Sequence, residues 1–320
     1  STIRLLMEEA YSKEAVFEIL SMLKADYPQF MTTTLESQFT LEQDEKGWLT
    51  VGIPAAELAY IPDETALAAA ESLLAEIPGV PAGQLSSAAA RAYSIYTYLT
   101  ANISYQAEGE ADGIGWNFTV QGAIRDGKAQ CNGIAGAFQL LCNLEDIPCY
   151  KVFYRGRDVA VIPAHVPNVV QLDGQWYHVD ITAAVQFRQT QEAYFAEEEM
   201  SPEILIPDFF GMSDEAALSG TLRYTGVLED KVPACPEPLG TRDSLYGCPA
   251  LPDVLAARKE DVYPAVSIRF GDADELSVFQ QNLFTGKLYI APLMDGLPYA
   301  AQIHIFRNQS TLYLYLNPSR

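Results

Sequence analysis

Three residues of this chain could together activate a thiol: Cys131, His165 and Asp180. A cysteine becomes a strong nucleophile when an imidazole takes its proton, and a carboxylate can orient that imidazole and stabilise its positive charge. The thiolate would then attack the acyl carbon of a peptide or amide, and water or an amine would resolve the thioester. Whether such a site exists depends on the elements that carry the three residues.

Cys131 lies where a helix is expected to begin. Apolar residues follow it with the spacing of one helix face, through Ile134, Ala135, Phe138, Leu141 and Cys142. Small residues along the same segment let another backbone approach closely, so we expect a central helix packed on a sheet. Free N–H groups in the first turn favour a thiolate there and can donate to an oxyanion.

His165 and Asp180 are expected on the two strands of a hairpin. Asp173-Gly174 is a strong signal for a two-residue loop, which pairs Leu172 with Gln175. Extending this register puts His165 and Asp180 on the same face as diagonal neighbours, with Cβ atoms roughly 7 Å apart or less.

The two faces of this hairpin differ in composition. One face is nearly all apolar and is expected to be core: Val166, Val170, Leu172, Tyr177, Val179 and Ile181. The other face carries the ionisable residues, with Val169, Gln171, Trp176, His178 and Thr182 beside the candidate pair. His178 is out of place for a triad, and we interpret it as a structural imidazole.

Composition limits the possible partners. The chain has 320 residues and a net charge of −22, which repels nucleic acid and anionic membranes and favours solubility. Its apolar runs are too short to span a membrane. The chain begins at Ser1, and no signal-peptide pattern precedes the first expected helix. We therefore expect either an expressed segment or a mature form, in which a removed leader would not be visible.

The five cysteines allow two arrangements. Cys131 could be free while Cys142 pairs with Cys149 and Cys235 pairs with Cys248, as in an exported protein, or all five could be reduced thiols. No CxxC motif is present, and the three histidines are too scattered for a convincing zinc site. We therefore expect no metal and no cofactor.

The rest of the chain divides into modules. We expect an N-terminal α+β module over residues 1–60, a core over 61–228, a Pro-rich linker or wrap over 229–264 and a β-rich module over 265–320. Each end module shows an outline of β-α-β-β order, including a helix at residues 11–26 and a strand at 287–292. The predicted class is α+β.

The central motifs resemble those of the transglutaminase-like superfamily, in its bacterial branch related to papain-like cysteine peptidases. Residues 131–138 read CNGIAGAF, residues 165–168 read HVPN, and residues 173–182 read DGQWYHVDIT. The similarity covers roughly residues 60–228. It implies a nucleophile helix packed on an antiparallel sheet, a Cys131–His165–Asp180 triad, and a peptide or protein substrate that is hydrolysed or transamidated. The flanking modules and the acidic surface suit an exported or surface-attached, and hence extracytoplasmic, bacterial protein, and the end modules could bind a protein or cell-surface partner.

Some residues near the motifs depart from the family pattern. Pro167 and Ala183-Ala184 stand where the family usually has Trp and Trp-Asp. These changes motivate an alternative, a non-catalytic binding or scaffold protein with an altered substrate groove. Residues expected near the oxyanion or the groove are Trp116, Gln121, Gln130, Pro167 and Trp176.

Overall fold

The computed structural model describes part of the chain, residues 2–6, 40–44, 48–52, 64–79, 86–106, 119–156, 165–218, 222–224, 232–239, 245–246, 265–270, 273–284, 302–308 and 311–317. Two compact units are present. The first comprises Ser1–Val80, Ser86–Thr182 and Phe210–Pro238, and the second comprises Pro81–Leu85, Ala183–Phe209 and Leu239–Arg320. The module boundaries expected from the sequence stay a prediction. Helices and antiparallel sheets occur in both units, so the α+β class is confirmed.

A four-stranded sheet carries the candidate site in the first unit. Its strand order is β10 (Phe210–Met212), β9 (Gln175–Val179), β8 (Asn168–Leu172) and β6 (Cys149–Lys151), and all neighbours are antiparallel. Leu172 pairs with Gln175, which confirms the predicted two-residue loop. Asp173 and Gly174 have φ values of 53° and 81°. This left-handed conformation suits the loop because it follows the twist of the flanking strands.

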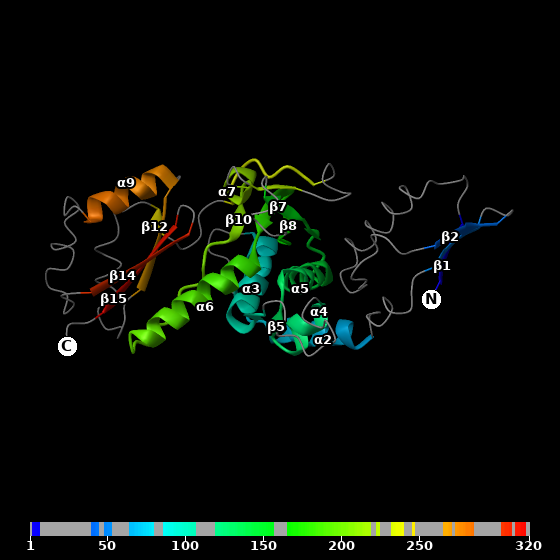
Figure 1. Ribbon diagram of the computed structural model, residues 1–320, viewed down its shortest axis with the longest axis horizontal. Helices are drawn as coiled ribbons and strands as arrows, with labels where there is room; N and C mark the ends of the chain where they lie inside the picture. Colours follow the sequence, from blue (N-terminus) through cyan, green and yellow to red (C-terminus); the bar gives the residue numbers. More distant parts are fainter. Residues whose placement is uncertain are drawn as a thin grey trace. The chain divides into compact units, whose positions relative to one another are not determined.

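Four helices of the first unit lie together, with α5 among the other three (Figure 1). They are α2 (Glu64–Glu76), α3 (Ser87–Asn102), α4 (Val120–Arg125) and α5 (Cys131–Leu144). The hydroxyl of Ser86 caps α3 by accepting from the Ala89 N–H at 3.2 Å, as its sequence position predicts. A short parallel pair, β4 (Ser104–Tyr105) and β5 (Lys128–Ala129), leads into α5.

Helix α5, which begins at Cys131, is buried as predicted. Ile134, Phe138 and Leu141 are completely covered. The amide of Asn168 on β8 donates to the backbone carbonyl of Ala135 at 3.0 Å, which ties the sheet to the helix. Asn168 shares its strand face with Val170, so this face of the sheet is the one that packs against α5.

The second face of the sheet, which carries the ionisable residues, is also buried. Val169 and His178 are fully covered there. The covering segments include the antiparallel pair β7 (Tyr154–Gly156) and β11 (Leu222–Tyr224), the short helix α7 (Asp214–Leu218) and the chain around Cys235. The polar His178 tolerates this position because it is hydrogen-bonded.

Helix α6 (Ile181–Glu197) begins directly after Asp180, and the strand expected to continue to Thr182 ends at Val179. Ile181, Ala184 and Val185 are all buried at helical spacing, so packing stabilises a helix from the first of them onward. Asp180 consequently lies at the junction of a strand and a helix.

The second unit contains a sheet of order β12-β13-β15-β14 and the helix α9 (Ala273–Phe284). Its strands are β12 (Leu245–Tyr246), β13 (Ala265–Arg269), β14 (Gln302–Asn308) and β15 (Thr311–Asn317). Its core joins α6 to this sheet through Phe195, Met200, Ala265, Tyr313 and Tyr315.

The N-terminal strands form a sheet of order β1-β3-β2, from β1 (Thr2–Leu6), β2 (Thr40–Gln43) and β3 (Trp48–Gly52). β2 and β3 pair antiparallel, in agreement with the last two strands of the expected β-α-β-β order. The expected helix at 11–26 and strand at 287–292 lie outside the described residues. Among the described helices, none combines the length and apolar character needed to cross a membrane.

Candidate active site

Cys131 is the first residue of α5 and is partly exposed. The first hydrogen bond within the helix runs from the Ile134 N–H to the Gln130 carbonyl at 3.0 Å, so the preceding N–H groups of the first turn have no partner in the helix ladder. The ammonium of the buried Lys151 donates to the side chain of Asn132 at 3.2 Å. Both features place positive potential beside the thiol.

His165 and Asp180 meet directly. The Nε2 atom of His165 lies 2.7 Å from Oδ2 of Asp180, with the side chains 27% and 13% exposed. The backbone of His165 is held separately, because its N–H and carbonyl both bond to Tyr154, at 3.0 and 2.8 Å. Contact by side chain and by backbone together fixes the position of the imidazole while leaving part of it accessible.

The charge on His165 follows from its surroundings. Burial lowers its pKa, but the charge and hydrogen bond of Asp180, together with a hydrogen bond to Cys131, outweigh burial and raise the pKa to about 10. The imidazole is therefore protonated at neutral pH. His165 is thus hydrogen-bonded to Asp180, and Cys131 is close enough to contribute to the rise in the pKa of the imidazole.

Two glutamines that were expected near the oxyanion, Gln121 and Gln130, are buried, and both precede the start of α5 in the sequence. Gln130 immediately precedes Cys131, and its Nε2 atom has no hydrogen-bond partner within the described part of the chain. Gln121 lies on α4, and its Oε1 atom likewise has no partner there. Buried amides without partners are uncommon, so each could serve a bound molecule. Trp116 lies outside the described residues.

The two remaining groove candidates make ordinary structural contacts. Pro167 directly precedes the internal strand β8, where a missing N–H does least harm, and its carbonyl accepts from the Val152 N–H at 2.9 Å. The ring of Trp176 stacks on Tyr150 with centroids 5.2 Å apart. These contacts do not involve the three candidate catalytic residues.

The described cysteines are all free thiols. Cys142 and Cys149 are buried free thiols rather than a disulfide, and burial, aided by the nearby Cys142, raises the pKa of Cys149. Burial, aided by the charge of Asp214, raises the pKa of Cys235 to about 12. Of the two arrangements that the sequence allows, the described cysteines are in the reduced one. Cys248 lies outside the described residues, so the pairing of Cys235 with Cys248 stays a prediction.

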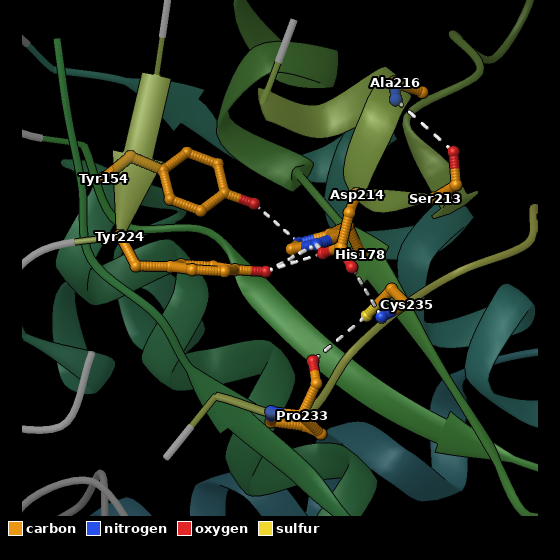
Figure 2. Close-up of polar contacts among 8 residues, drawn as sticks. All are labelled: Tyr154, His178, Ser213, Asp214, Ala216, Tyr224, Pro233 and Cys235. Atoms are coloured by element: carbon orange, nitrogen blue, oxygen red, sulfur yellow. Dashed lines mark hydrogen bonds and ion pairs between the residues drawn. The ribbon is translucent and has the colours of Figure 1, made fainter. Parts of the chain in front are cut away.

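A second polar cluster surrounds His178 (Figure 2) and was not predicted. One ligand atom each from His178, Asp214 and Cys235 lies within 4.8 Å of the others, a nitrogen, oxygen and sulfur set of the kind that zinc accepts. The sequence offered only His178 as a signal, since Asp214 and Cys235 come from distant segments without a motif.

The central segment of the chain matches one family model. Residues 79–181 match the family model of the Transglutaminase-like superfamily. A search of curated proteins found no match.

Among solved structures, one described as a TGase has 13% identity and a TM-score of 0.30, over 56% of this chain and 50% of that chain. A candidate cysteine protease from Cytophaga hutchinsonii has 10% identity and a TM-score of 0.28, over 57% and 71%. A candidate protease from Parabacteroides distasonis has 9% identity and a TM-score of 0.30, over 89% and 57%. The chain therefore spans only about half the length of the TGase and of the Parabacteroides protein.

Proposed function

We propose that this chain, whose residues 79–181 form a domain of the transglutaminase-like superfamily, is a thiol-dependent enzyme that acts on a peptide or amide. The observation that carries the proposal is the series from Asp180 through His165 to Cys131 at the start of a buried helix. An imidazole that is protonated at neutral pH beside a thiol favours a thiolate–imidazolium pair, which is the reactive form of such a site.

Acylation would proceed in two linked transfers. The Cys131 thiolate attacks the carbonyl carbon and forms a tetrahedral adduct, whose oxygen becomes negative. The imidazolium of His165 then gives its proton to the leaving nitrogen as the carbon–nitrogen bond breaks, which leaves a thioester on Cys131 and a neutral imidazole. Nε2 of His165 already bonds Asp180, so Nδ1 is the atom left to exchange the proton.

The oxyanion needs donors close to Cys131. The first-turn N–H group of Cys131 is one candidate, because it precedes the ladder of α5. The buried Nε2 of Gln130 is the second, because it is a donor without a partner within the described residues. Both come from adjacent positions of the chain, so one substrate oxygen could lie between them.

Deacylation regenerates the thiol. Neutral His165 takes a proton from water or from a primary amine as that nucleophile attacks the thioester, and the thiolate leaves. Water gives hydrolysis, and an amine gives transamidation. We propose hydrolysis as the main reaction, with a peptide or protein as the substrate.

A screen of peptide and isopeptide amides tests this function. The expected result is release of an amine or ammonia by the wild type and none by Cys131→Ala. Adding a primary amine such as a biotinylated alkylamine separates the two reactions, since transamidation attaches the label to the substrate. Turnover that persists unchanged in Cys131→Ala would contradict the proposal.

The rival function is a binding protein on the same fold, motivated by Pro167 and by Ala183-Ala184 in place of the family's aromatic residues. Pro167 does not interrupt β8, because it precedes the strand and its carbonyl still pairs. A binding protein needs no reactive thiol, so slow alkylation of Cys131 would favour the rival.

An extracytoplasmic location and a protein or cell-surface partner for the end modules belong to the same proposal. The excess of acidic residues is compatible with both. Antibody detection of the protein in cell fractions of the source organism tests the location directly, and a purely cytoplasmic signal would contradict it.

A further inference from the structure

The cluster around His178 is a closed hydrogen-bonding network in the covered face of the sheet. The Tyr154 hydroxyl lies 2.6 Å from Nδ1 of His178, and Nε2 of His178 lies 2.8 Å from Oδ1 of Asp214. The Tyr224 hydroxyl lies 2.9 Å from both Nε2 of His178 and Oδ1 of Asp214. Figure 2 shows both tyrosine hydroxyls pointing at the groups of this pair. The remaining oxygen of Asp214 accepts from the Cys235 N–H at 2.8 Å.

The protonation states give these bonds a direction. Burial would raise the pKa of Asp214, but its bonds from His178, Cys235 and Tyr224 lower it, so the carboxylate only accepts. Burial lowers the pKa of His178, so its ring is neutral with a single N–H. That N–H must be on Nε2, facing Asp214. Nδ1 therefore accepts, and the Tyr154 hydroxyl must donate to it.

This network reaches both residues of the candidate catalytic pair. Tyr154 is the residue whose N–H and carbonyl hold the backbone of His165, and its ring lies edge-on to the His165 ring with centroids 6.4 Å apart. His178 is on β9, two positions before Asp180. The bond between Tyr154 and His178 therefore joins the segment that carries His165 to the strand that leads to Asp180.

The side-chain atoms of His178, Asp214 and Cys235 have hydrogen-bond partners without a metal ion. Both nitrogens of His178 and both oxygens of Asp214 already have protein partners, and the Cys235 sulfur donates to the Pro233 carbonyl at 3.7 Å. A zinc ion would have to separate Nε2 from Oδ1, which are in hydrogen-bond contact. The geometry favours a bracing role over a metal site.

We propose that Tyr154, His178 and Asp214 are positioning residues, which hold His165 in register with Asp180 and so keep its imidazole beside Cys131. The inference rests on the proposed function, because it concerns the geometry of that thiol site. Substitution of any of these three residues should weaken the reactivity of Cys131, although none of them touches a reacting atom.

The test compares alkylation of Cys131 by neutral iodoacetamide and by anionic iodoacetate at pH 7, with rates followed by mass spectrometry. An imidazolium beside the thiolate attracts the anionic reagent, so the ratio of the two rates reports the position of His165 and not merely the stability of the fold. Tyr154→Phe removes only the hydroxyl. Tyr177→Phe is the matched control, because its hydroxyl bonds Gln175 on the same strand, away from the network.

We expect Tyr154→Phe to lower the rate of alkylation by iodoacetamide roughly tenfold, because a displacement of the His165 imidazole by well under 1 Å is enough for such a loss. The ratio of the iodoacetate rate to the iodoacetamide rate should then come close to that of a free-thiol peptide. Tyr177→Phe should stay within about twofold of the wild type. A folded Tyr154→Phe protein with wild-type rate and ratio would overturn the inference, even if its melting temperature fell.

Two further proteins keep the outcome decisive. Should Tyr154→Phe not fold, Asp214→Asn replaces it: the amide can donate to Nε2, which reverses the His178 tautomer and removes the acceptor for Tyr154, so the ratio should again fall. A wild-type ratio in folded Asp214→Asn overturns the inference. His165→Ala distinguishes failure of this inference from failure of the proposed function. If the wild type has the same alkylation rate and the same rate ratio as His165→Ala, the proposed function fails as well.

Discussion

Replacing Asp180 with Asn removes the charge that keeps His165 protonated while preserving the size of the side chain. The pKa of His165 is raised from 6.5 to about 10, although burial acts in the opposite direction. Asp180 is the largest of the influences that raise it. At about 1.4 kcal/mol for each pKa unit, the difference corresponds to a preference of about 5 kcal/mol for the imidazolium.

The expected effect of Asp180→Asn is smaller than the whole preference. The His165 side chain is 27% exposed, so water screens part of the interaction, and the Asn oxygen can still accept a hydrogen bond. The contact with Cys131 also remains. We therefore expect the pKa of His165 to fall by about two units in Asp180→Asn.

Two-dimensional NMR of the imidazole Cε1–H groups measures this directly. The chain has only three histidines, and His165→Gln identifies the signal of interest by its disappearance. The wild-type signal should titrate near pH 10, and the Asp180→Asn signal should titrate near 8, given about two units lost with the charge. A wild-type midpoint close to 6.5, or one that Asp180→Asn leaves in place, would refute the charge pairing on which the mechanism depends.

Three other predictions concern stability, each measured by urea unfolding. The pKa of His165 is raised on folding, so the stabilisation that His165 gives to the folded state is complete below about pH 6.5 and is lost as the pH rises through about 10. The unfolding free energy should therefore fall over that pH range more steeply in the wild type than in His165→Gln. An equal fall of the unfolding free energy with pH in both proteins would contradict this. Asn168→Ala should lower the unfolding free energy by about 1 to 3 kcal/mol, because it breaks the buried hydrogen bond between the sheet and α5. Substitution of the exposed Asn102 by Ala should lower it by less than about 0.5 kcal/mol. Similar losses in the two variants would show that the Asn168 bond does not stabilise the packing of sheet on helix. Arg91→Ala should lower the unfolding free energy by about 1 to 2 kcal/mol, since the guanidinium donates to two carbonyls near the end of α2 and to Glu145. If the unfolding free energy falls no further in Arg91→Ala than in Glu145→Gln, only the surface ion pair contributes.

Local patterns predicted the start of α5 and the register of the hairpin. The apolar spacing after Cys131 follows one helix face, and the structure buries that face. Asp173-Gly174 favours a two-residue loop, and the observed pairing has that loop. Both features depend on contacts between residues close in sequence, which is why the sequence alone sufficed.

Features that depend on distant segments were missed. The β-branched residues Ile181 and Thr182 continue the alternating pattern of β9, but packing of Ile181, Ala184 and Val185 stabilises a helix instead. The partners of His178 are Asp214, Tyr224 and Cys235, which follow it through a helix and several connections, and no motif marks them. The covering of the second face of the sheet likewise depends on segments that are distant in sequence.

The reactivity of Cys131 tests the central claim most directly. Iodoacetamide is added at neutral pH, and the modified cysteines are mapped by mass spectrometry against a free-thiol peptide. We predict rapid modification confined to Cys131 among the described cysteines, because burial keeps Cys149 and Cys235 protonated, and a large loss of rate in His165→Ala. Modification of Cys131 no faster than the peptide, with no change in His165→Ala, would contradict an activated thiol at this site.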